Sequence, residues 1–430
     1  MTATDSTLSD VLELYGPSSG IYSASPARAQ AAGVEISIVN DLSSVEAEWR
    51  EFEKRADYTG FQAFDWLDAW QRHVGARQEI VPAIVLGRRV DGHVLFILPL
   101  AITRRGRVRK LTWLGWDLSD YNAPILAQDF ALHMDAARFL AAWRVITELL
   151  RKDPRLSFDI VDLQKMPETI GTQKNPFLAL PVVPNPSGAY STELGQDWET
   201  FYATKRSSAT RRRDRTKLRR LAEYGEVRWV EVQSPEEIER TMNALIEQKA
   251  RSLAKMGVAN LFAPPGRREF FLEIAADPGL REFVHVSRLE IGPEIVAANL
   301  GLMLRGRYYH VLSSYGGGEW SRFGPGAAHL HALLRCAIER GFDRFDFTIG
   351  DEPYKREWCE THSRLYDHYS ASSARGRPIL ALYIAARRTK RLIKQTPMLW
   401  SAFSAARAFA GSMRSWAADC VERAHEWKGR

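Results

Sequence analysis

Two stretches of this chain have the same order of expected strands and helices, and this repetition constrains the fold more than any other feature. Val34–Val39 alternates apolar and polar residues as a half-buried strand does, and Ser43 is placed to cap a helix that runs to about Ala56. Strands interleaved with helices indicate an α/β fold, here occurring twice. The other elements expected in the first stretch are helix Asp65–His73, strands Val81–Leu86, Val94–Ile102 and Arg109–Leu114, helix Asp135–Leu150 and strand Phe158–Leu163.

A second stretch repeats this layout after a linker rich in proline and asparagine, Pro176–Gly188. A chain of 430 residues is too long for one ordinary domain, so we expect one domain at 33–180 and another at 185–372. The last strand, Leu365–Ser370, is expected to close the second domain. The other elements expected there are strand Ala189–Glu193, helices Asp197–Lys205 and Ser207–Tyr224, strand Val227–Val232, helix Pro235–Lys255, strands Phe283–Leu289, Val296–Leu304 and Tyr308–Ser314, helix Gly326–Arg340 and strand Arg344–Phe347.

The two ends of the chain differ from its body in composition. Residues 1–32 are rich in Ser, Ala and Gly and lack a basic start before an apolar core, so we expect a disordered leader rather than a signal peptide. Residues 375–430 carry twelve basic and three acidic side chains, a net charge of +9 that leaves −2 for the rest. No apolar run is long enough to span a bilayer. The three cysteines form no C-x-x-C pair, which indicates a reducing cytoplasm and neither a disulfide framework nor a zinc site.

The stretch Phe345–Trp358 says most about chemistry. It reads as a short buried strand, a glycine turn at Gly350, and Lys355 held between two aromatic residues. Upstream, Gly324–Ala328 opens an apolar helix that leads into this strand. A glycine-rich turn at a helix start presents free backbone N–H groups, which suit a phosphate or a diphosphate. The sequence therefore predicts an anion site close to a charged strand end.

This order of strand, glycine loop, helix, strand and aromatic-flanked lysine resembles the core of the GNAT acyl-CoA N-acyltransferase superfamily. More narrowly, it resembles the cellulose-biosynthesis-associated acetyltransferase-like branch, whose relatives include the FemAB-like peptidyltransferases. The resemblance covers roughly residues 34–370 and rests on layout alone in the first stretch. It implies an α/β (α+β) fold of two tandem GNAT-like domains with mixed central sheets flanked by helices. It also implies acyl-CoA or acyl carrier protein as co-substrate, an amine acceptor, and no permanently bound cofactor or metal.

The resemblance assigns candidate site residues as well. In FemAB-like proteins the lysine of a K-x-x-F motif contacts substrate or stabilises transition-state charge, and Lys355 in Y-K-x-x-W is similar. In GNAT enzymes the strand before the phosphate loop, here Tyr308–Ser314, splays from its neighbour to make an acyl slot. The residues expected to hold the donor are Arg322, Gly324, Gly326, Ala327 and Ala328. The residues expected to bind substrate are Tyr315, Asp351, Tyr354 and Trp358.

Each catalytic candidate also has a structural interpretation. Lys355 could be a surface lysine whose stem lies over its aromatic neighbours. Asp346 stands between two phenylalanines, so it either faces a cleft as a general base or pairs with an arginine. His310 could deprotonate an amine near neutral pH, or it could be a hydrogen-bonded core histidine. The sequence leaves all three alternatives open.

The glycine loop departs from the usual GNAT pattern in two ways. Arg322 stands one position too near the glycine, and Pro325 supplies no backbone N–H. A proline at a helix start flanked by glycines is equally a structural cap. The loop therefore predicts either a site for the CoA diphosphate or a plain helix cap.

Two basic regions complete the candidate interfaces. In the helix expected within 205–220, seven closely spaced basic side chains surround a single acid, Asp214. They suit CoA phosphates, an anionic substrate, lipid headgroups or a solvated face, whereas the lack of interleaved aromatics argues against nucleic acid. Residues 375–430 combine basic residues with aromatics such as Trp400 and Trp416, which suits an interfacial helix on an anionic membrane. Packing against the body, or a dimer contact, is the alternative for this tail.

Together with the resemblance, these features predict a cytoplasmic N-acyltransferase that works peripherally at the inner membrane face. It would move an acyl group from acyl-CoA or acyl carrier protein to an amine on a lipid, envelope or polysaccharide precursor. One alternative is a non-catalytic scaffold in exopolysaccharide (cellulose) biosynthesis, which the imperfect loop favours. Another is a FemAB-like peptidyltransferase that uses aminoacyl-tRNA, which would account for the basic helix.

Overall fold

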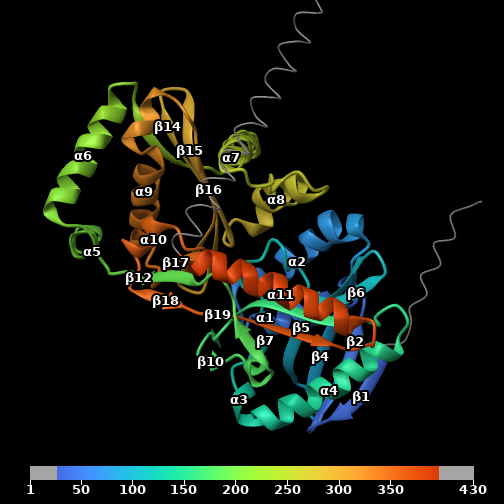
Figure 1. Ribbon diagram of the computed structural model, residues 1–430. Helices are drawn as coiled ribbons and strands as arrows, with labels where there is room; N and C mark the ends of the chain where they lie inside the picture. The colour runs from blue at the N-terminus through green and yellow to red at the C-terminus, as the bar shows by residue number, and fades with distance from the viewer. Residues whose placement is uncertain (1–26, 397–430) are drawn as a thin grey trace, which may run out of the picture.

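The computed structural model describes residues 27–396, which form two β-sheets that pack against each other through helices (Figure 1). The first sheet has 10 strands in the order β1-β2-β4-β5-β6-β8-β19-β11, with β3 and β7 joined to it beside β5. Its strands are β1 Ala27–Ala31, β2 Val34–Val39, β3 Ala56–Asp57, β4 Val81–Arg89, β5 Val94–Arg105, β6 Val108–Trp113, β7 Ile125–Ala127, β8 Ile160–Pro167, β11 Val182–Pro184 and β19 Leu365–Ala371. Its helices are α1 Glu46–Glu53, α2 Phe64–Trp70, α3 Phe130–His133, α4 Ala136–Lys152 and α11 Gly376–Gln395.

The second sheet has seven strands in the order β13-β14-β15-β16-β17-β12-β18. Its strands are β12 Ala189–Glu193, β13 Val227–Glu231, β14 Val284–Ile291, β15 Glu294–Leu304, β16 Arg307–Tyr315, β17 Arg344–Ile349 and β18 Thr361–Ser363. Its helices are α5 Trp198–Lys205, α6 Ser208–Ala222, α7 Pro235–Lys255, α8 Arg267–Ala276, α9 Pro325–Glu339 and α10 Pro353–Arg356. A small hairpin of β9 Thr169–Ile170 and β10 Gln173–Lys174 lies apart from both sheets.

Helices α7 and α9 cover opposite faces of the second sheet, because successive side chains of a strand point to opposite sides. On β16, Tyr309 belongs to the apolar core that contains Met242 of α7. Its neighbour Tyr308 belongs instead to the cluster that contains Leu333 of α9. The α7 face is also the face that meets the first domain (Figure 1).

The two sheets repeat one arrangement around a parallel strand pair. In the first sheet β6 leads through α4 to β8, and β6 and β8 pair in parallel at Lys110–Ile160 and Leu111–Val161. In the second sheet β16 leads through α9 to β17, and these strands also pair in parallel. All other strand pairs in both sheets are antiparallel. The repeated layout expected from the sequence is therefore present in the described residues.

One continuous apolar core joins the two domains. Trp66 of α2 is fully buried, and its ring packs edge-on against Phe270 of α8 at a centroid distance of 4.9 Å. An ion pair of 2.5 Å between Arg267 and Asp117 crosses the same boundary. Because large aromatic side chains bury the most apolar area, this contact fixes the two sheets relative to each other.

The prediction that Leu365–Ser370 closes the second domain is wrong, because this strand belongs to the first sheet. As β19 it lies between β8 and β11 and pairs with both in antiparallel register. Asp367 of β19 is buried there and accepts hydrogen bonds from the Lys165 backbone N–H (2.9 Å) and the Asn185 amide (2.7 Å). The chain therefore returns to its first domain after completing the second.

The terminal segments are only partly within the described residues. Residues 27–31, expected in the disordered leader, form strand β1 and pair with β2. Residues 1–26 and 397–430 lie outside the described range, so the predictions for them remain predictions. Within the described range, no helix is long and apolar enough to cross a membrane.

Helix α11 is docked on the first sheet, against β19 and β8 (Figure 1). Gly376 begins this helix where any Cβ would lie 2.2 Å from the Asp159 carbonyl oxygen. The Tyr383 hydroxyl accepts a hydrogen bond of 2.7 Å from Gln164, and its ring lies 4.5 Å from the Lys110 ammonium. The part of the basic tail that forms α11 is therefore a packed element, as the alternative interpretation expected.

We expect a chain that ends at Ala374 to lose stability, and a chain that ends at Thr396 to keep it. Removing α11 exposes the apolar surface of β8 and β19 that Tyr383 and its neighbours cover, which costs about 2 kcal/mol or more. Thermal unfolding of the two truncated chains measures the difference. Equal melting temperatures would show that α11 does not stabilise the first sheet.

Candidate active site

The parallel strands β16 and β17 separate after a short paired region, as the resemblance led us to expect. They pair only at Arg307–Arg344, Tyr308–Phe345 and Tyr309–Asp346, although β16 continues to Tyr315 and β17 to Ile349. Thr348 has a φ of +59°, a left-handed conformation that is costly for a β-branched residue. The bend at Thr348 turns β17 away from β16, and the strands are unpaired beyond Tyr309 and Asp346. We call this splayed region between the two strand ends the slot.

A lysine lies at each edge of this slot. Lys355 of α10 is only 4% exposed, and its Nζ donates to the Ile349 carbonyl at 2.9 Å and pairs with Glu352 at 3.0 Å. Lys249 of α7 donates to the Ser313 carbonyl at 3.2 Å, and burial lowers its pKa. The strand ends thus carry one ammonium group each, from helices far apart in the sequence.

Lys355 is not a surface lysine, so that interpretation of the sequence is wrong. Its α10 turn folds the side chain back under the end of β17, where it also lies 3.5 Å from the Thr348 carbonyl. Its aromatic neighbours differ in position: Tyr354 is 36% exposed, whereas Trp358 is buried and stacks on Phe201 and Tyr202. Trp358 is therefore a core residue, and the prediction that it binds substrate has no support from its position.

The first domain supplies a carboxylate to the same slot. Asp120 lies in the turn before β7, and its carboxylate lies near Thr348. Burial raises the pKa of Asp120, and the positive charges of Lys165 and Lys355 oppose that rise. We did not predict Asp120 or Lys249 from the sequence, because no local motif surrounds either residue.

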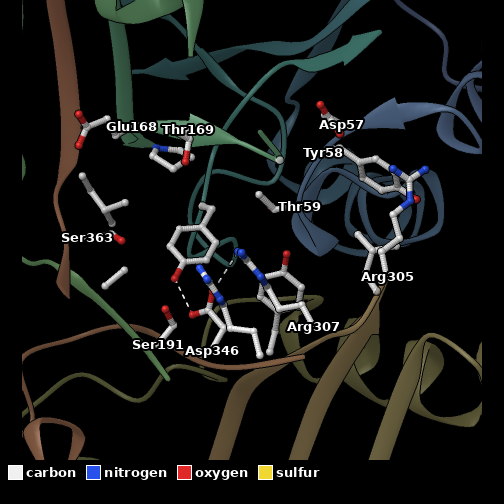
Figure 2. A pocket seen from close by; sticks show the side chains of 18 of the residues that line it. Asp57, Tyr58, Thr59, Glu168, Thr169, Ser191, Arg305, Arg307, Asp346 and Ser363 are labelled. Carbon is white, nitrogen blue, oxygen red and sulfur yellow. Dashed lines mark hydrogen bonds and ion pairs between the residues drawn. The ribbon is translucent and has the colours of Figure 1, made fainter. Parts of the chain in front are cut away.

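Asp346 faces a cavity of about 190 Å³ between the two domains, where Figure 2 shows it beside Arg307. Its carboxylate accepts hydrogen bonds from the Tyr121 hydroxyl (2.7 Å) and the Thr348 backbone N–H (2.8 Å), and it lies 3.5 Å from Arg307. Burial raises the pKa of Asp346. Three partners hold this carboxylate in place, which supports the arginine-paired interpretation of the sequence.

His310 of β16 lies in the core, on the face of the second sheet that α9 covers. Burial lowers its pKa to about 3, so the ring is neutral at physiological pH. The Asn299 amide can be oriented so that both its oxygen and its nitrogen have hydrogen-bond partners. In that orientation Asn299 Nδ2 donates to His310 Nε2 at 3.1 Å. The ring also contacts Phe345 and Phe347. These contacts support the interpretation of His310 as a satisfied core histidine.

The glycine loop begins α9 without a side-chain cap. Gly324 has a φ of +69°, and its carbonyl accepts the N–H groups of both Ala327 (3.0 Å) and Ala328 (3.1 Å). Position 326 has little room for a side chain, because a Cβ there would lie 3.0 Å from the Tyr315 ring. Two of the N–H groups expected to be free are therefore already bonded, and Tyr315 packs on the helix start.

A cavity of about 380 Å³ lies beside this helix start, between α9 and the pair α5 and α6. Gly324, Ala327 and Ala328 line one side, and Arg215 and Lys217 of the basic helix line the other. Arg322 points toward α6, where it lies 3.4 Å from the Tyr224 hydroxyl. The structure thus brings together the predicted loop and the basic helix, which the sequence separates by about a hundred residues.

The remaining substrate candidate, Asp351, is exposed at the turn after β17. Its carboxylate has weak contacts of 3.4 Å with the Gly188 N–H and 3.5 Å with the Tyr190 hydroxyl. These contacts join the domain linker to the end of β17, and they leave Asp351 accessible from solvent.

The comparisons with known proteins support this fold. Residues 208–356 match the family described as acetyltransferase (GNAT) domain, a range that runs from α6 to Lys355 and Arg356. Among solved structures, FemX is similar with a TM-score of 0.53 and 10% identity, over 78% of this chain and 97% of FemX. The chain has a FemAB-like tandem GNAT fold.

Two further solved structures are less similar to this chain. A conserved protein of unknown function from Bacteroides thetaiotaomicron VPI-5482 has a TM-score of 0.48 and 11% identity, over 77% of this chain and 98% of that chain. A tandem GNAT protein from the clavulanic acid biosynthesis pathway has a TM-score of 0.45 and 10% identity, over 79% of this chain and 99% of that chain. No curated protein sequence matches the chain.

Proposed function

We propose that this protein is an N-acyltransferase that moves an acyl group from acyl-CoA or acyl carrier protein to an amine. The observation that carries this proposal is the slot between β16 and β17, with Lys249 and Lys355 at its edges. A thioester placed in the slot would have a fixed ammonium group near the oxygen that becomes negative in the transition state. The strand geometry would supply proximity between thioester and amine.

The second domain is the better candidate for the donor site. Helices α4 and α9 each connect the two strands of a parallel pair, but the N-termini of these two helices differ in charge. In the first domain, α4 begins at Asp135, whose carboxylate accepts the Arg138 N–H at 2.8 Å. That negative charge occupies the place a phosphate would take. In the second domain, α9 begins at Gly324 with no side-chain cap and with basic residues of α6 across the adjacent cavity.

The acceptor amine would approach from the side of the first domain. Asp120 of that domain lies near Thr348 at the slot and is our candidate to take a proton from the amine. Its raised pKa makes it a better base than an exposed aspartate. Lys355 would stabilise the oxyanion, and Lys249 would support the same charge from the opposite edge.

A second candidate donor is aminoacyl-tRNA, and the observation that favours it is the exposed surface of α6. This helix has one buried residue, Leu221, and directs most of its basic side chains to solvent near the cavity between α6 and α9, which we call the donor cavity. Such a surface would bind a polyanion with strong dependence on salt. An anionic membrane that contacts residues 375–430 is a further proposal, in which the portion beyond α11 would bind lipid.

We expect palmitoyl-CoA, acetyl-CoA or CoA to raise the melting temperature of the full chain. Ligand at 100 times its Kd stabilises a folded protein by about 2.7 kcal/mol. Thermal-shift measurements with these ligands and with tRNA measure the effect. Stabilisation by tRNA alone would select the aminoacyl donor, and no stabilisation by any of them would favour the scaffold.

The matched control for this measurement uses the two helix starts. Ala327→Glu places a carboxylate in the first turn of α9, beside the donor cavity, where it would repel phosphate without destabilising the helix. Ala137→Glu makes the same change in the first turn of α4. We expect the first variant to lose the ligand shift and the second to keep it.

A further inference from the structure

Three side chains with metal-binding atoms meet under α9, on the face of the second sheet that this helix covers. They are Glu231 at the end of β13, His285 on β14 and Cys336 on α9, and their ligand atoms all lie within 4.8 Å of one another. Glu231 pairs with Ser287, two residues from His285, so both side chains lie on the same face of neighbouring strands. None of the three belongs to the donor or acceptor site described above.

The imidazole of His285 has one ring nitrogen without a partner. The Tyr308 hydroxyl lies 2.9 Å from His285 Nδ1 and 2.7 Å from the Asn299 Oδ1 that accepts its hydrogen. Tyr308 therefore accepts from Nδ1–H, which leaves the lone pair of the neutral ring on Nε2. That atom is buried and has no hydrogen-bond partner. Buried polar atoms are almost always satisfied, so an orphaned one points to a missing ligand.

We propose that Glu231, His285 and Cys336 bind a divalent zinc ion, with a water molecule as fourth ligand. A thiolate, a neutral imidazole and a carboxylate form a ligand set that suits zinc rather than magnesium or calcium. The Nδ1–H to Tyr308 hydrogen bond fixes the tautomer that a metal-binding histidine requires. Binding forms a sulfur–zinc bond while the Cys336 thiol proton leaves to solvent.

The site is pre-arranged but open. Metal–ligand bonds of about 2.0–2.3 Å place ligand atoms about 3.5 Å apart, so the three side chains would close by roughly 1 Å. Glu231 and Cys336 are both partly exposed, which gives the ion a path from solvent. Arg340, one turn after Cys336, forms an ion pair with Glu231 Oε1 and leaves the second carboxylate oxygen for the metal.

Arg340 is also a competing cation, and this gives the site a distinctive property. Zinc and Arg340 would share Glu231, so removing the guanidinium should tighten zinc binding. A bound ion would join β13, β14 and α9, and would brace the helix whose N-terminus faces the donor cavity.

The test uses the full chain, with any affinity tag removed and in a Cys420→Ser background so that the uncharacterised tail thiol does not contribute. Cobalt chloride is titrated as an absorbing substitute for zinc, and the near-ultraviolet thiolate-to-cobalt band is followed. Zinc chloride is then added to displace the cobalt. Inductively coupled plasma mass spectrometry counts the zinc retained after desalting.

We expect one ion per chain, a cobalt band that zinc abolishes, and loss of the band in Cys336→Ser. The matched control is Cys359→Ser, which removes the other described thiol and should leave the band unchanged. Arg340→Gln should lower the Kd for zinc at least tenfold if the two cations compete. Absence of a band in the parent, or a band that survives in Cys336→Ser, would overturn the proposal.

Discussion

Replacing Lys355 by methionine is expected to reduce acyl transfer by about 10²–10³-fold, the usual cost of losing one oxyanion partner. Methionine has a similar length and no charge, so it preserves most of the packing of this buried side chain. The Ile349 carbonyl and Glu352 would lose their partner, which adds a stability cost of about 1–3 kcal/mol. Turnover under saturating donor and acceptor, together with urea unfolding, separates the two effects.

Lys255→Met is the matched control, because Lys255 is an exposed lysine at the end of α7. We expect it to change neither turnover nor stability measurably. If Lys355→Met loses stability but keeps its turnover within a few-fold of the parent, Lys355 is a structural residue. The assignment of the slot as an acyl-transfer site would then lose its main chemical support.

Trp66→Ala is expected to destabilise the whole protein by about 3–5 kcal/mol, the usual cost of removing a fully buried aromatic ring. Trp66 packs between Phe61 of its own domain and Phe270 of the second, and its indole N–H donates to Ser119 at 3.2 Å. Because this ring belongs to the core shared by both sheets, both domains should unfold at a lower denaturant concentration.

Hydrogen exchange of β4 and of β16 measures the two domains separately in the same sample. Trp198→Ala serves as a control, because Trp198 is partly exposed and lies on α5, away from the interface. A Trp66→Ala protein in which β4 loses protection and β16 keeps it would contradict the shared core. The two sheets would then be independent folding units.

Local pattern was sufficient to predict most of the elements and their class. The basic helix expected at Ser207–Tyr224 is α6, with Ser207 as its N-cap accepting from the Thr210 N–H at 3.2 Å. The fold class and the GNAT resemblance are confirmed by the sheets and by the family match. Alternation, helix caps and the linker are local signals, so the sequence contains them directly.

Pairings between distant segments could not be predicted in the same way. The alternation of apolar and polar residues predicts that Leu365–Ser370 is a strand, but it does not specify which strand will pair with it. In the structure this strand, β19, pairs with β8 of the first sheet. The burial of Lys355 could not be predicted, because the α10 turn, which folds its ammonium under β17, follows from tertiary contacts. Asp120, Lys249 and the proposed ligands Glu231, His285 and Cys336 come from separate elements, so no spacing rule detects them.

Hydrogen–deuterium exchange with saturating palmitoyl-CoA tests the central claim, that the donor binds in the slot of the second domain. We predict that the ligand protects the end of β16, the start of α9 and residues 348–356. The equivalent parallel pair of the first domain, β6 and β8, should exchange as in the free protein. Protection of β6 and β8 instead, or donor binding without protection along β16 and β17, would contradict this account.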